Sequence, residues 1–359
     1  MDKDRGLEAA PAAPGAPAPG PATPTPGRPR APRLAAAALL GLALVAFLAV
    51  ASLVAGSASL GAAEAASALL GRAASAKAQL IVWGVRMPRT LAAIVCGAAL
   101  ASAGLLLQSS LDNDLAAPSV MGVNSGAGLG ALLAALLAPQ QPLVRALAAF
   151  AGALASTLVV YLISRRAGVA RSTLVLSGVA VSSLMSAGVD VIITVRPDLV
   201  TDRVAFSLGG FSSVSAEALG LAAPVVLAAL VAGLLLAPGV DLFALGDEAA
   251  FGLGLDVRRH RLLAIGCSAL LSAAAVSVCG LLGFVGLIVP NLVRMVGRAG
   301  TARGLALCCV WGAALVLGCD LVARLAFYPY ELPVGLILSA LGAPFFILML
   351  TRRHQRGRA

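Results

Sequence analysis

The chain has 359 residues, of which 60% are hydrophobic and only 12% carry a charge. A soluble domain is closer to half apolar and a quarter charged, so this composition excludes an ordinary soluble protein and indicates a membrane protein. A net charge of +10 would suit a nucleic-acid partner. However, the basic residues stand in short segments between apolar runs, which is a topology pattern of membrane proteins, and we predict no nucleic-acid binding.

The chain opens with a segment rich in Pro, Ala and Gly, residues 1–33, which predicts a disordered tail. Apolar runs of roughly span length then follow one another to the end of the chain. The run at 281–296 is short and contains Pro290, so a broken or tilted span is expected there. The runs cover residues 34–55, 91–111, 119–138, 143–163, 173–195, 218–238, 262–279, 281–296, 305–325 and 333–350.

These runs predict an all-α polytopic membrane protein with about ten transmembrane helices. The transmembrane domain is expected over residues 34–351, followed by a basic C-terminus at 352–359. If the N-terminus is cytoplasmic and the spans alternate, eighteen of the 26 Lys and Arg residues fall inside. This bias predicts that both termini are cytoplasmic and that the protein lies in the inner membrane as a multi-pass protein.

Two connections are longer than a minimal turn requires. One covers about residues 56–88 on the predicted outer side, and the other covers about 239–261 on the inner side. The inner segment is compatible with an amphipathic helix that Asp241 caps, with Leu245, Ala249 and Leu253 on one face. It is a candidate docking element, although a solvated connector fits the pattern as well.

The sequence holds no constellation of residues that indicates an enzyme or a cofactor site. There is no phosphate-binding loop, so the chain is not expected to bind ATP in that way. The six cysteines lie in apolar runs without metal-ligand spacing and are predicted to be small buried residues. Residues 112–114 are read as a polar turn rather than a metal site. The glycines of residues 122–130 predict close helix packing.

A few charged residues near the ends of the spans are candidates for function. Asp320 and Arg324 are four residues apart on one helical run and are predicted to pair. Arg86 and Arg89 flank Pro88 at the mouth of the second span, on the same predicted outer rim as Arg324. Arginines at one rim suit a partner that presents carboxylates, but interfacial anchoring is an equal alternative.

Several segments in a fixed order carry a family resemblance: residues 86–131, 174–184, 243–261, 280–297 and 320–350. With them the chain, from about residue 80 to residue 350, resembles the FecCD-type permeases of ABC importers for iron-siderophore, haem and cobalamin. Relatives commonly carry His where Asn291 stands and a basic residue where Phe251 stands, so the local contacts of these two positions are open.

The resemblance implies a permease without bond chemistry that works with four kinds of partner. These are cytoplasmic ATP-binding subunits, an extracytoplasmic substrate-binding protein, a second permease subunit (the same or a related chain) and membrane lipid. It assigns docking of the binding protein to Arg86, Arg89 and Arg324. It assigns coupling to the ATPase to Leu245, Gly246, Asp247, Glu248, Gly252, Leu253 and Gly254.

Ferric siderophore is the favoured cargo, with haem or cobalamin as the alternative. A proton-driven secondary transporter is a rival that would need a relay of intramembrane acids, for which Asp190 and Asp320 are the candidates. An intramembrane enzyme is a second rival and would need a metal or nucleophile cluster at depth.

Overall fold

The structure is a computed structural model that describes residues 31–55, 64, 67–68, 75–167, 171–297, 300–327 and 330–356. Residues 1–30, which make up most of the predicted tail, lie outside the described residues. The first helix begins at Ala31, three residues before the predicted boundary. The last helix runs to Arg356, so residues 352–356 of the predicted basic C-terminus continue it.

Within the described residues, each of the ten apolar runs coincides with a helix. Seven helical stretches are long and apolar enough to cross a membrane, while three apolar helices (Val123–Leu137, Val285–Val296 and Val334–Met349) are shorter. The number of spans therefore stays a prediction. The ten helices are α1 (Ala31–Val54), α4 (Met87–Leu111), α5 (Val123–Leu137), α6 (Pro142–Ala167), α7 (Arg171–Val195), α9 (Ala216–Leu242), α11 (Val257–Cys279), α12 (Val285–Val296), α13 (Thr301–Leu325) and α14 (Val334–Arg356).

The predicted outer segment 56–88 is not all loop. Its last part forms α3 (Ala76–Ile81) and a π-helical turn η1 (Val82–Arg86), which continue into α4 as one helix of 36 residues. A proline inside a helix removes a hydrogen bond and collides with the preceding turn. The widened turn, closed by the bond from Met87 N to Val82 O, stands directly before Pro88 and accommodates the proline without ending the helix.

Besides α3, the structure contains another short helix that the sequence did not predict. Between α7 and α9 the chain forms a 3-10 turn, η3 (Pro197–Leu199), and α8 (Val200–Leu208). No residue of α8 is buried. Its end is tied to the bundle by backbone bonds from Gly210 N to Cys279 O and from Leu281 N to Phe206 O.

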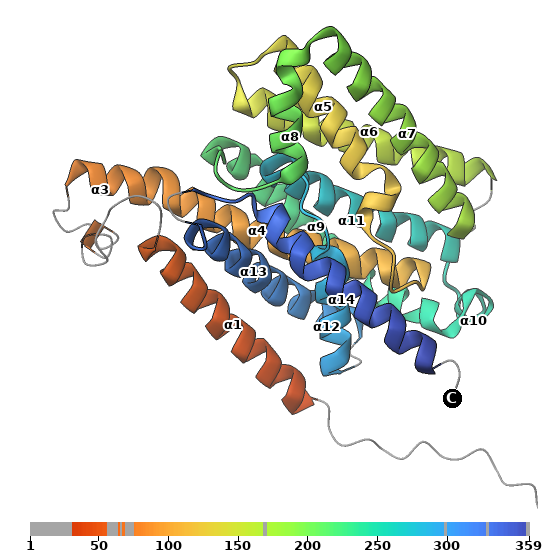
Figure 1. The fold of residues 1–359 in the computed structure, drawn as a ribbon. Helices are drawn as coiled ribbons and strands as arrows, with labels where there is room; N and C mark the ends of the chain where they lie inside the picture. The colour runs from red at the N-terminus through yellow and green to blue at the C-terminus, as the bar shows by residue number, and fades with distance from the viewer. Residues whose placement is uncertain are drawn as a thin grey trace, which may run out of the picture.

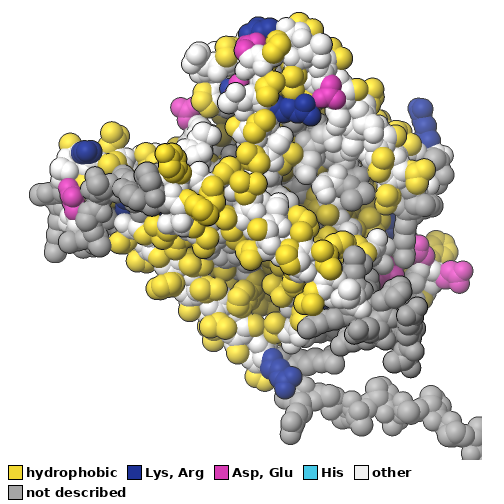
Figure 2. Space-filling model, viewed as in Figure 1, with side chains coloured by type: hydrophobic (Ala, Val, Ile, Leu, Met, Phe, Trp, Pro, Cys, Tyr) yellow, Lys and Arg dark blue, Asp and Glu magenta, His cyan; other side chains and the backbone are white. Residues whose placement is uncertain are grey.

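The centre of the bundle is formed by α4, which lies against α11, α12 and α13 (Figure 1). Small residues permit this: a side chain at Gly97 would strike the backbone of Gly312 in α13, and one at Gly104 would strike Gly286 in α12. The glycines of residues 122–130 have the predicted role, because Gly126 lies against Gly152 of α6. Apolar side chains spread across the middle of the face in Figure 2, while charged ones gather toward its ends.

Candidate functional site

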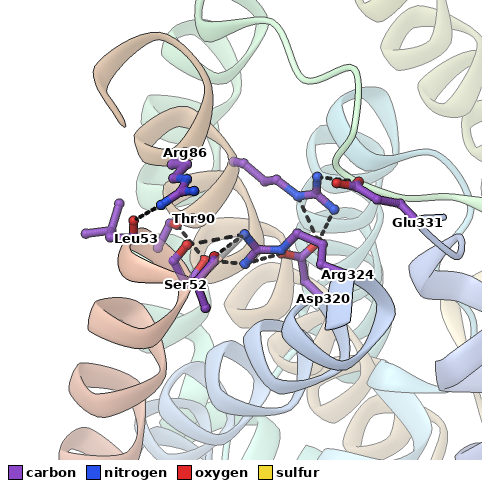
Figure 3. Close-up of polar contacts among 9 residues, drawn as sticks. Ser52, Leu53, Arg86, Thr90, Asp320, Arg324 and Glu331 are labelled. Atoms are coloured by element: carbon purple, nitrogen blue, oxygen red, sulfur yellow. Dashed lines mark hydrogen bonds and ion pairs between the residues drawn. The ribbon is translucent and has the colours of Figure 1, made fainter. Parts of the chain in front are cut away.

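Three arginines from two distant parts of the chain meet at one end of the bundle. Arg86 is the last residue of η1, Arg89 lies in the first turn of α4, and Arg324 comes from the last turn of α13. Figure 3 shows Arg86 and Arg324 side by side at this end. With Asp320 and Glu331 they form what we call the arginine cluster. The three arginines are only 4%, 7% and 3% exposed, so the cluster is largely buried rather than spread over the surface.

Two of these arginines hold the end of α1. Arg86 Nη1 donates to the carbonyl oxygens of Leu53 and Val54, both at 2.8 Å. Arg324 Nη1 donates to the carbonyls of Ser52 and Ala55 at 3.2 Å, and its Nη2 donates to Ser52 Oγ at 2.6 Å (Figure 3). The last carbonyls of a helix have no partner within it and attract cations. The two arginines therefore cap α1 and fix it to the bundle.

The carboxylates of the cluster balance part of this charge. Arg89 Nε and Nη2 both donate to Asp320 Oδ1, at 3.0 and 2.9 Å, and Arg89 Nη1 donates to Glu331 Oε2 at 2.8 Å. The predicted pairing of Asp320 with Arg324 is confirmed at 3.1 Å. The pairing of Asp320 with Arg89 was missed, because 231 residues separate the partners and no local pattern links them.

The structure thus brings the three predicted docking arginines together, but it shows them bonded within the chain. Its five members are three cationic and two anionic side chains. Glu331 is its more accessible acid, with 27% of its side chain exposed against 0% for Asp320. The docking role itself stays a prediction.

The prediction of one amphipathic helix over residues 239–261 is wrong, because several elements divide this segment. The chain instead continues α9 to Leu242 and makes a 3-10 turn, η4 (Phe243–Leu245). It then forms a six-residue helix, α10 (Asp247–Gly252). Gly246 and Gly254 have φ of 92° and 88°, a backbone conformation that ends a helix on either side of α10. Asp241 does not cap this segment: its carboxylate accepts bonds from the backbone N–H and hydroxyl of Thr301 at the start of α13.

The connection from residue 243 to residue 256 presents apolar side chains at the surface. Leu245, Phe251 and Leu253 are 61%, 74% and 65% exposed, whereas Ala250 is fully buried and anchors α10. Asp247, one of the predicted coupling residues, pairs with Arg261 of α11 at 2.6 Å. Exposed apolar residues beside acidic ones are typical of a contact surface.

The end of α4 nearest this connection carries a second polar network, with α12. Arg294 donates to Gln108 Oε1 at 2.5 Å and to Asp114 Oδ1 at 2.8 Å. Asn291 Nδ2 donates to the carbonyls of Leu287 and Asp114 at 2.8 and 3.2 Å. The departure at Asn291 is therefore accommodated by backbone acceptors, and residues 112–114 form the predicted polar turn.

A cavity of about 570 Å³ lies beside the arginine cluster and shares Arg89 and Glu331 with it. This volume falls in the range of small-molecule sites, about 300–1,000 Å³. Its polar lining combines hydroxyl and amide groups with charged side chains. The hydroxyl and amide groups are Asn124, Ser125, Ser186, Ser207, Ser212, Ser213, Ser215 and Ser277, and the charged side chains are Arg89, Arg145, Asp202, Arg203 and Glu331.

The cysteines have the predicted environment: five are buried, and Cys309 is partly buried. Asp190, the other acid considered for a proton relay, is 62% exposed at its side chain and pairs with Arg203 at 3.0 Å. Within the described parts of the chain, no group of three or more His, Cys, Asp or Glu side chains could hold a metal ion.

Together, the apolar helices, the glycine contacts between them and the polar networks at both ends define a multi-span helical membrane protein. The chain belongs to the FecCD transport family, whose model matches residues 43–352. The match begins within α1, earlier than the resemblance seen in the sequence. The protein is therefore a multi-pass transport protein of the inner membrane, and the predicted family and location are confirmed.

Curated relatives support this over most of their length. The chain is 37% identical to the hemin transport system permease HmuU of Yersinia pestis over 283 residues, 77% of this chain and 85% of the relative. It is 39% identical to the vitamin B12 import permease BtuC of Vibrio cholerae, over 77% of this chain and 84% of the relative. It is 33% identical to the ferric enterobactin permease FepG of Escherichia coli, over 81% and 88%.

A solved structure also has this fold. An inward-facing conformation of a putative metal-chelate type ABC transporter superposes with a TM-score of 0.77 at 27% identity, covering 88% of this chain and 98% of that one.

Proposed function

We propose that this protein is the membrane-spanning subunit of an ATP-binding-cassette importer that carries a ferric siderophore inward by alternating access. The main support for the proposal is that the two segments we assign to partners lie at opposite ends of one bundle. The arginine cluster stands at the start of α4, and the exposed 243–256 connection stands beside its end. An importer needs one contact with the protein that delivers its cargo and another with the ATPase that supplies the energy.

Delivery is assigned to an extracytoplasmic substrate-binding protein that docks at the arginine cluster. Arginine suits a partner's carboxylate because its planar fork binds both oxygens and keeps its charge. The accessible Glu331 beside Arg89 supports this assignment, because it marks where another carboxylate could reach the Arg89 guanidinium. The neighbouring cavity is where we place the arriving chelate, because hydroxyl and amide groups suit an oxygen-rich ligand.

We assign the energy-coupling contact to two cytoplasmic ATP-binding subunits, which bind the 243–256 connection in a cleft. Leu245, Phe251 and Leu253 supply the apolar contact, and the acidic start of α10 supplies charge. This assignment requires the connection and both termini to be cytoplasmic. In Figure 1 the start of α1, α10 and the end of α14 all lie away from α3, on the lower right side, which supports that orientation. A second permease subunit, identical or related, completes the transporter.

The cargo is the part of the proposal that the relatives leave open, since their names include hemin, vitamin B12 and ferric enterobactin at similar identity. We test it by deleting the gene and measuring uptake of three labelled cargoes: a ferric siderophore, haem and cobalamin. Ferric siderophore uptake should be lost and restored by a plasmid copy, while the other two continue. Loss of haem or cobalamin uptake instead would overturn the siderophore assignment.

A further inference from the structure

Arg261 connects three elements at the end of the bundle that holds α10. It lies in the first turns of α11 and is only 5% exposed. Its Nη1 and Nη2 donate to the two oxygens of Asp247 in α10, at 3.0 and 2.6 Å. Its Nε donates to the carbonyl of Ser110 at 3.0 Å, and its guanidinium lies 5.0 Å from the ring centre of Phe243.

The geometry of these contacts makes Arg261 a rigid link. A bidentate arginine–carboxylate pair fixes distance and angle together, which a single hydrogen bond does not. Ser110 belongs to the last turn of α4, where carbonyls lack helical partners and a cation is favourable. Lysine could meet Asp247 or Ser110, but it has no planar fork that holds both at once.

α4 is positioned to carry a displacement across the molecule. From Arg89 to Ser110 it runs 21 residues, or about 32 Å at 1.5 Å per residue. Arg89 of the arginine cluster stands at its start, while Gln108 and Ser110 at its end receive Arg294 of α12 and Arg261 of α11. Packing against α11, α12 and α13 on small residues leaves little room for it to bend.

The geometry points to Arg261 as the positioning residue that passes the movement of α10 to the end of α4. This inference rests on the proposed function, in which α10 contacts the ATPase. When the ATPase moves α10, Asp247 moves the guanidinium, and the Ser110 carbonyl and α4 follow. The exposed apolar residues make the contact with the ATPase, whereas Arg261 makes the contact within the permease.

The test uses the complete transporter in proteoliposomes with its ATPase and binding protein. We measure ligand uptake and ATP hydrolysis in the same preparation for Arg261→Lys and Asp247→Asn, and we record thermal unfolding of each complex. Arg261→Lys should lower uptake per ATP hydrolysed by roughly fivefold or more, the scale of a typical coupling between sites, with ATP hydrolysis largely retained. Asp247→Asn should lower the ratio less, because an amide oxygen still accepts one bond.

Asp198→Asn is the matched control, since it breaks an exposed arginine–aspartate pair with Arg196 elsewhere in the chain, and its ratio should stay unchanged. An unchanged ratio in both test variants would overturn the inference. This includes the case in which uptake and hydrolysis fall in the same proportion, since that result indicates a purely structural role. If Arg261→Lys does not assemble, Asp247→Asn alone decides. Failure of the proposed function looks different, because the unmodified transporter would then show no ATP-driven uptake.

Discussion

At the scale of single residues, the guanidinium of Arg89 pairs with two acids that differ in solvent exposure. Asp320 is fully buried, whereas 27% of the Glu331 side chain is exposed. Arg86 and Arg324 are occupied by the carbonyls at the end of α1. A docking carboxylate would therefore reach Arg89 most readily, by taking the place of Glu331.

This exchange predicts that Glu331→Gln tightens binding of the substrate-binding protein, because it removes the competing charge. The gain should be about 1 kcal/mol, or roughly fivefold in Kd, the upper range for a partly exposed ion pair. Binding of the purified partner to the reconstituted transporter measures it. Asp198→Asn serves as the control acid and should have no effect.

Arg89→Glu gives the opposite test and needs a stability measurement beside it. The new carboxylate would face the buried Asp320, and breaking a buried pair costs about 3–5 kcal/mol. Binding should be lost in the fraction that still folds. Unchanged affinity in both Glu331→Gln and Arg89→Glu would mean that the arginines only cap α1 and anchor the bundle.

At the scale of elements, the apolar runs were sufficient to locate ten helices, because lipid requires long uninterrupted apolar segments. The side-chain pattern gave wrong predictions where the backbone conformation of a few residues decides whether a helix ends or continues. Gly246 and Gly254 take positive φ and divide the inner connection, so its apparent helical face does not exist. At Pro88 the π turn preserves a helix that the proline seemed to begin.

Because Gly246 and Gly254 divide the 243–256 connection, substitutions in it can be predicted to affect uptake. Gly246→Glu places a side chain at φ 92°, which strains a residue with a Cβ, and Leu253→Glu puts a charge on the exposed apolar surface. Both should abolish ATP-driven uptake while the protein still inserts, which membrane fractionation can show. Leu137→Glu changes an 80% exposed leucine at the end of α5 and should leave uptake intact. Uptake that survives both variants would make the segment a plain connector.

At the scale of the whole molecule, hydrogen bonds and ion pairs between segments distant in the sequence join the helices at each end of the bundle. The arginine cluster joins α1, α4 and α13, and the opposite network joins α4 to α10, α11 and α12. The sequence could place the three proposed docking arginines at one rim, because span alternation sorts residues by side. It could not reveal that Arg89 meets Asp320 or that Arg294 meets Gln108, since 231 and 186 residues separate these partners.

The measurement that tests the central claim most directly is uptake of ferric siderophore into proteoliposomes that hold the permease, its ATPase and its binding protein. For an ATP-driven importer, uptake should require ATP hydrolysis, stop with a non-hydrolysable analogue and continue when the proton gradient is dissipated. Uptake driven by a proton gradient in the absence of ATP would instead indicate a secondary transporter.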